Sequence, residues 1–138
     1  MNLSKDMQKV FTEEAKNAIE RMKSADRPEE KLFFMSAVHG AAFRVMNIQF
    51  DPELAFIHHV VNAAYGMMNA NLALMRQGQV FHTFPDNVFE KLEDALEQLV
   101  AKIEQGEKTY PALESIFNLA YSTTGNGYYL YLKGMLSV

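Results

Sequence analysis

Between residues 32 and 75 the sequence holds two long apolar stretches, which meet at Asp51-Pro52-Glu53. Proline and acidic residues are favoured in the first turn of a helix, so this triplet predicts the start of a new helix. Each flanking stretch is apolar around most of the helical circumference. Such a helix must be covered on nearly every side, by its own chain or by a second copy. The feature predicts a central helical hairpin over residues 28–77, around which the rest of the chain is arranged.

Three further segments show the pattern of helices with one buried face. The first covers residues 5–24 after the capping residue Ser4, and another covers residues 85–105 before Gly106. The last begins at Thr109 and Pro111. Its buried face is predicted to hold Leu113, Ile116, Phe117, Ala120 and Tyr121.

The two helices of the hairpin are predicted over residues 28–49 and 52–77, followed by a left-handed stop at Gly78. Residues 123–127 contain two glycines, so we expect a kink or break there, followed by a further helical segment up to residue 137. A short strand at residues 128–132 is the alternative, because short apolar runs are ambiguous.

Taken together, these elements predict an all-α fold in a single domain over residues 1–138. Proline-marked helix starts and short connections are typical of an antiparallel bundle, here of five or six helices around the apolar hairpin.

Composition narrows the range of partners. The chain has 13 basic and 17 acidic residues, a formal net charge of −4, and no basic stripe of the kind that nucleic-acid binding needs. Polar residues interrupt both apolar stretches, which argues against membrane-spanning helices. The absence of cysteine excludes disulfides, and no apolar secretory segment is seen near the start, so we predict a cytoplasmic location.

On a helical wheel, the helix over residues 52–77 divides into three kinds of face. Large apolar residues are predicted to fill the core, and small residues permit the close approach of another helix. A narrow polar strip is either a window to solvent or a polar seam in an interface. The small-residue stripe consists of Ala63, Gly66, Ala70 and Ala73 with His59 among them, and the polar stripe of His58, Asn62, Asn69 and Arg76.

The histidines suggest a second kind of site. His39 lies in an apolar sector and is predicted to be a neutral core residue with one or two hydrogen bonds. His58 and His59 are adjacent, so their side chains diverge by about 100° and cannot face one metal ion together. Neither has an acidic residue three or four positions away, the spacing that metal-binding bundles use. We predict no cofactor, although a pocket formed by His39, His59 and Tyr65 is the alternative.

Enzymatic activity is the least supported class of function. No serine or threonine is paired locally with a histidine, as nucleophilic catalysis requires. An acidic metal site would need carboxylates that face inward, and four candidates are predicted to face solvent: Glu13, Glu90, Glu93 and Asp94. We therefore assign no catalytic residue.

The balance of apolar faces favours self-association. The helices over residues 5–24 and 85–105 each offer one apolar face, whereas the central hairpin needs cover on several. The sequence therefore predicts an interaction or structural module that forms a homo-oligomer, with a two-fold dimer as the default. Its interface is expected along the small-residue stripe. The alternative function is a small-molecule- or metal-binding bundle that uses His39, His59 and Tyr65.

Overall fold

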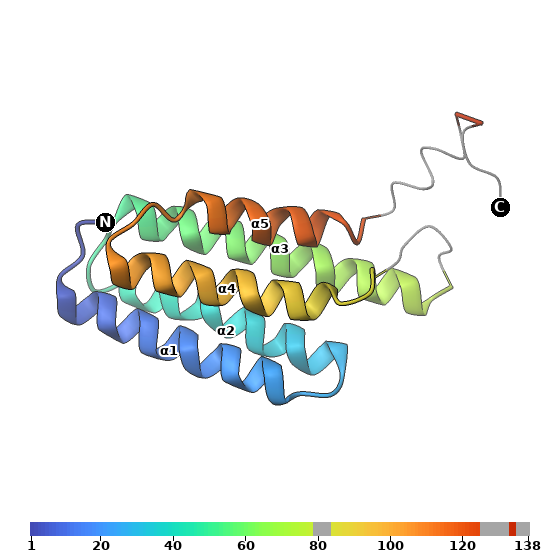
Figure 1. Cartoon of the computed structure of the whole chain (residues 1–138), viewed down its shortest axis with the longest axis horizontal. Helices are drawn as coiled ribbons and strands as arrows, with labels where there is room; N and C mark the ends of the chain where they lie inside the picture. Colours follow the sequence, from blue (N-terminus) through green and yellow to red (C-terminus); the bar gives the residue numbers. More distant parts are fainter. Residues whose placement is uncertain (79–83, 125–132, 135–138) are drawn as a thin grey trace.

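The computed structural model describes residues 1–78, 84–124 and 133–134. Within these ranges the chain is all-helical, as predicted, and contains no strand. The segment predicted to follow the last helix lies almost entirely outside the described residues. The helices are α1 (Lys5–Ser24), α2 (Pro28–Met46), α3 (Pro52–Arg76), α4 (Val88–Gln105) and α5 (Tyr110–Tyr121) (Figure 1).

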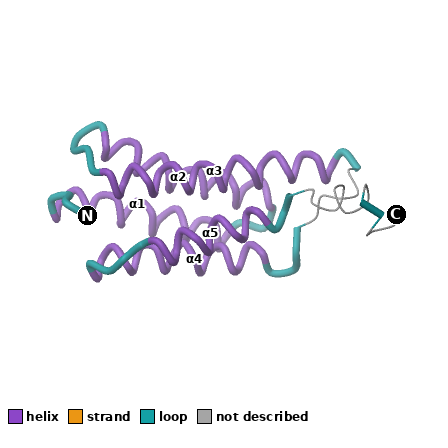
Figure 2. Tube along the Cα trace, turned by 90° about the horizontal axis from the view of Figure 1, so that it is seen from above, coloured by secondary structure: helices purple, strands orange, loops and turns teal. Residues whose placement is uncertain are grey.

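The helices form a closed ring in the order α1, α2, α3, α5, α4. Figure 2 shows the α2–α3 pair on one side of the bundle and the α4–α5 pair on the other. Thr109 at the start of α5 bonds to Glu53 at the start of α3, and Thr123 beyond α5 bonds to Asn71. These contacts show that α3 and α5 run parallel. Within the described ranges no helix has both the length and the apolar character needed to cross a membrane.

Most helix ends follow their predicted signals. The Ser4 hydroxyl accepts a hydrogen bond from the Met7 amide at 3.2 Å, and Gly106 ends α4 in the left-handed conformation with φ 68°. The prediction for α2 was three residues too long. This helix ends at Met46, because the amides of both Ile48 and Gln49 turn back to the Val45 carbonyl.

The start of α4 also differs from the prediction. Pro85 does not begin the helix; its carbonyl accepts a hydrogen bond from the Val88 amide, which closes a turn. Asn87 within that turn is left-handed, with φ 62°, and so interrupts helical geometry. The helix therefore begins at Val88.

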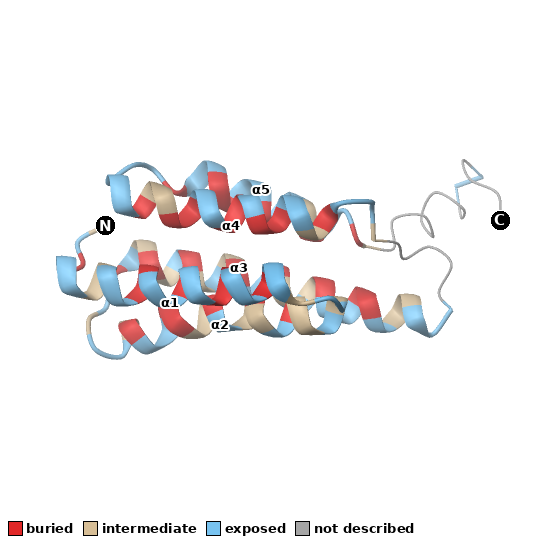
Figure 3. Cartoon of the chain, turned by 60° about the horizontal axis from the view of Figure 1, so that its bottom comes forward, coloured by how far each residue is buried: buried red, intermediate tan, exposed pale blue. Residues whose placement is uncertain are grey.

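Buried side chains line the inward faces of all five helices (Figure 3). In α5, Leu113, Ile116 and Ala120 are buried as predicted. Phe117 and Tyr121 are not, since 38% and 50% of their surfaces are exposed. The prediction for these two was wrong because, among the described helices, α5 packs mainly on α3 and α4, which leaves its outer aromatic side chains uncovered.

One carboxylate is buried against the prediction. Glu93 of α4 is 5% exposed and accepts a hydrogen bond from Lys31 of α2 at 2.9 Å. The same ammonium group donates to the Met22 carbonyl near the end of α1 at 2.7 Å. This ion pair therefore joins three helices at one end of the bundle.

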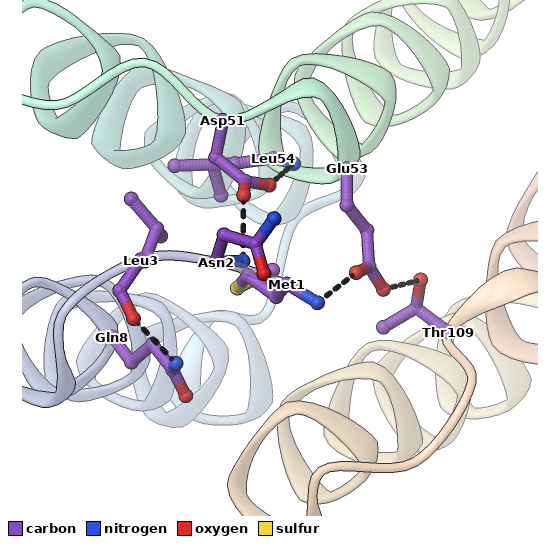
Figure 4. A network of polar contacts seen from close by, with 8 residues as sticks. All are labelled: Met1, Asn2, Leu3, Gln8, Asp51, Glu53, Leu54 and Thr109. Atoms are coloured by element: carbon purple, nitrogen blue, oxygen red, sulfur yellow. Dashed lines mark hydrogen bonds and ion pairs between the residues drawn. The ribbon is translucent and has the colours of Figure 1, made fainter.

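At the opposite end, the first residues of the chain lie across the start of α3 (Figure 4). Asp51 is 2% exposed and accepts from the amides of Leu54, at 3.0 Å, and Asn2, at 2.8 Å. The Met1 amino group lies 2.8 Å from a carboxylate oxygen of Glu53. That hydrogen bond, followed by the attraction between the two charges, raises the pKa of the amino group.

Candidate interaction surface

The small-residue stripe of α3 faces solvent in the isolated chain. Every one of its members is exposed: His59, Ala63, Gly66, Ala70 and Ala73. The stripe lies on the part of α3 that is left between α2 and α5, the two helices that pack against it. No described helix of the same chain covers it, so the close helix approach that the stripe permits is still available to another molecule.

The polar stripe runs along the border between α3 and α2. Asn62 and Asn69 are exposed, whereas His58 is half-buried against α2. Arg76 forms an ion pair with Glu29 at the start of α2, at 2.6 Å. Part of the polar stripe is therefore a window to solvent, and part lies between two helices of the same chain, whereas a polar seam in an interface with another molecule stays a prediction.

Exposed aromatic side chains border the small-residue stripe on the side of α5. Phe56 on α3 is 49% exposed, and Tyr110 on α5 is 60% exposed. Phe117 and Tyr121 extend this border along α5 and stack on each other, with ring centroids 6.4 Å apart and planes inclined by 23°. The exposed aromatic side chains project from the surface next to the small-residue stripe, which is lower, so the two together form a stepped surface.

Charged groups are nearly absent from this surface. Residues 54–75 of α3 include no lysine, arginine, aspartate or glutamate, and Glu114 is the single charged residue of α5. The opposite side of the bundle is different, because ion pairs such as Lys16–Glu104 link α1 to α4 there. Depletion of charge together with enrichment of aromatic residues is the compositional mark of interface cores.

Gly66 has no evident role within the chain. A β-carbon at this position would meet no heavy atom within 4 Å. Glycine in the middle of a helix is less stable than alanine by about 1 kcal/mol. No close contact with the described part of the chain offsets that difference.

A cluster of aromatic rings closes the seam between α2 and α3. The His39 ring lies between His58 and Tyr65, with centroids 5.5 and 5.6 Å away, and Phe43 contacts His58 at 5.7 Å. Nδ1 of His58 lies 2.9 Å from the backbone oxygen of His39. A carbonyl only accepts, so this nitrogen carries the proton.

The structure only partly assembles the predicted pocket of His39, His59 and Tyr65. His39 and Tyr65 are in contact, whereas the His59 ring lies against His58, 5.2 Å away, and is exposed. No group of three or more histidine or acidic residues within the described ranges is arranged to hold a metal ion. Both ring nitrogens of His39 are buried, so neither is open to a ligand.

His39 itself departs from the prediction of one or two hydrogen bonds. Neither ring nitrogen has a partner in the described structure. Burial, and then the charge of the neighbouring His58, lowers the pKa of His39 from its ordinary value of 6.5. The groups facing this ring are His58 and Tyr65, and α3 offers no carboxylate between residues 54 and 75 that could stabilise an imidazolium ion.

Acidification is therefore expected to destabilise the fold through His39. The folded-state pKa lies below the unfolded value, so the unfolded chain takes up the proton first and stability falls as the pH drops below about 6.5. The loss reaches about 1.4 kcal/mol for each unit by which the two pKa values differ. Substitution His39→Phe keeps an aromatic ring and removes the titrating group. Urea unfolding at about pH 7 and pH 5 should show a smaller loss in this variant, and an equal loss in both proteins would contradict the assignment.

Comparison of the chain with protein-family models, with curated proteins and with solved structures found no match. The candidate surface therefore rests on the geometry and chemistry of the chain alone. Sequence patterns located the small-residue stripe but missed its aromatic border, since Phe56, Phe117 and Tyr121 were assigned to the core. Predicting this border requires knowing which helices are neighbours in the ring. A helical wheel drawn for one helix does not give that information.

Proposed function

We propose that this protein is a self-associating interaction module, and that two copies meet through the outer face of α3 and its aromatic border on α5. The observation that carries the proposal is the nearly charge-free surface formed by the small-residue stripe, Phe56, Phe117 and Tyr121. Monomeric soluble proteins rarely expose a contiguous apolar patch, and such patches commonly mark sites of interaction with another molecule.

A second copy is the favoured partner for two reasons. Close packing of two helices needs small residues on both, and the same stripe on a second copy supplies them around Gly66. The surface also has almost no charge that would select a complementary charged partner. Two-fold symmetry, in which the same patch is used twice, is the commonest arrangement of homo-oligomers. A cytoplasmic location belongs to the same proposal and is supported by the absence of cysteine.

The test is a single charge placed in the stripe. Ala70 is exposed, so Ala70→Arg is expected to leave the stability of one chain within about 0.5 kcal/mol. In the dimer the same side chain would be buried without a partner, so the dissociation constant should rise at least about 100-fold. Sedimentation velocity over a range of protein concentrations measures this change.

Ala37→Arg is the matched control, because Ala37 is an exposed alanine of α2 that lies beside α1. This variant should associate like the unmodified protein. A chain that sediments as a monomer throughout, or an equal response of the two variants, would rule out the proposed surface.

A further inference from the structure

A groove runs between α3 and α5, and three residues of the aromatic border line it. It encloses about 340 Å³, and its walls are formed by Phe56 and Val60 from α3 and by Tyr110, Glu114, Phe117 and Asn118 from α5. Tyr110, Glu114 and Phe117 follow one another at intervals of four and three residues, so they share one face of α5. The volume falls at the lower end of the range of small-molecule sites.

The walls of the groove combine aromatic rings with a single negative charge. Three aromatic rings line the groove, and Glu114 is its only charged group. Glu114 is exposed and forms no ion pair with any described residue. In contrast, the groove between α1 and α4 contains Lys16 and Glu104, which already pair with each other. The carboxylate between α3 and α5 therefore has its charge available to a ligand.

From this arrangement we infer that the groove binds a hydrophobic ammonium compound, that is, an amine with an apolar or aromatic body. Aromatic faces attract cations through their electron density, and the apolar body would cover Val60 and the rings. Glu114 would accept hydrogen bonds from the ammonium group, with the Asn118 side-chain oxygen as a second acceptor. An anion would be repelled by Glu114, and a neutral analogue would desolvate that carboxylate without replacing its hydrogen bonds.

The groove is complete within one chain, but Phe56 and Phe117 belong both to it and to the proposed dimer surface, so a dimer formed there would cover the groove. Binding is therefore measured in the Ala70→Arg variant, which is expected to be monomeric, and in the unmodified protein at concentrations below those at which it associates. Loss of the dimer with binding retained would show that the two properties fail separately.

Three probes of similar size test the inference: 2-phenylethylammonium, 2-phenylethanol and 3-phenylpropionate. In a protein-observed NMR titration the cation should bind at least about tenfold more tightly than the alcohol, and the anion should not bind. Glu114→Gln should abolish the preference for the cation. Glu90→Gln removes an exposed carboxylate of α4 that does not line the groove, and this control should bind like the unmodified protein.

Equal affinity for the cation and the alcohol would overturn the inference. An unchanged preference in Glu114→Gln, or no binding of the cation at millimolar concentration, would do so too.

Discussion

Replacement of Glu93 by alanine is expected to lower the free energy of unfolding by about 2–4 kcal/mol. Removing one partner of a buried ion pair leaves the other charge uncompensated, which typically costs about 3–5 kcal/mol. The lower end of the expected range reflects Lys31, whose side chain keeps 17% of its surface exposed and still donates to the Met22 carbonyl. Urea denaturation followed by circular dichroism measures the change.

A matched control comes from the same helix. Glu104 also pairs with a lysine of a neighbouring helix, at 2.8 Å, but 44% of the Glu104 side chain is exposed. Exposed pairs contribute about 0.2–1 kcal/mol, so Glu104→Ala should stay within that range. If Glu93→Ala lowered the free energy of unfolding no more than Glu104→Ala, the idea that burial makes the Lys31–Glu93 pair more stabilising than an exposed pair would be wrong.

The second large effect is expected at Asp51, where Asp51→Ala should destabilise the fold by about 2–4 kcal/mol. One carboxylate oxygen caps α3 through the Leu54 amide, and loss of a cap costs about 1 kcal/mol. The other oxygen accepts from the Asn2 amide, and a part-buried donor left without its partner costs about 1–3 kcal/mol more. Thermal and urea unfolding of the variant measure the sum.

Asp51→Asn separates the two contributions. Asparagine is as good a cap as aspartate, but its side chain has a single oxygen, so the Asn2 amide would face an NH₂ group. We expect this variant to lose about 1–2 kcal/mol. Ser4→Ala, at an exposed cap, should lose about 0.5–1 kcal/mol and serves as the control for capping alone. Full stability in Asp51→Asn would mean that the contact with Asn2 contributes nothing.

Local chemistry explains which helix boundaries were predictable. As helix caps, Ser4, Asp51 and Gly106 act on backbone groups within a few residues of themselves, so these helix ends can be foreseen from short stretches of sequence. The bond from the Asn2 amide to Asp51 spans 49 positions and could not be foreseen in this way. The start of α4 was placed three residues too early, since the left-handed conformation of Asn87 depends on how the chain returns to the bundle. Asparagine adopts the left-handed conformation more readily than most residues, but an asparagine in the sequence does not by itself predict that conformation.

Neighbour relations explain the errors at individual side chains. Glu93 lies at the edge of the apolar face of α4. It is buried because Lys31 of α2 packs against it and donates a hydrogen bond to its carboxylate. The reverse holds for Phe117 and Tyr121, which stay exposed because none of the described helices lies outside α5 to cover them. Helical periodicity specifies the direction of each side chain, whereas burial depends on which element occupies that direction.

The ring order has a consequence for how the protein opens. α1, α2 and α3 follow one another through short turns, and α4 and α5 form a separate hairpin that packs on this group mainly through α1 and α3, with the Lys31–Glu93 pair as its link to α2. Two cooperative units are the natural outcome, because each is held together by contacts between sequential helices. In amide hydrogen exchange, α4 and α5 should lose protection together while α2, which is joined to α4 through the Lys31–Glu93 pair and packs mainly on α1 and α3, remains protected. Such partial opening would expose the inner faces of α1 and α3 without unfolding the hairpin that supports the proposed interface.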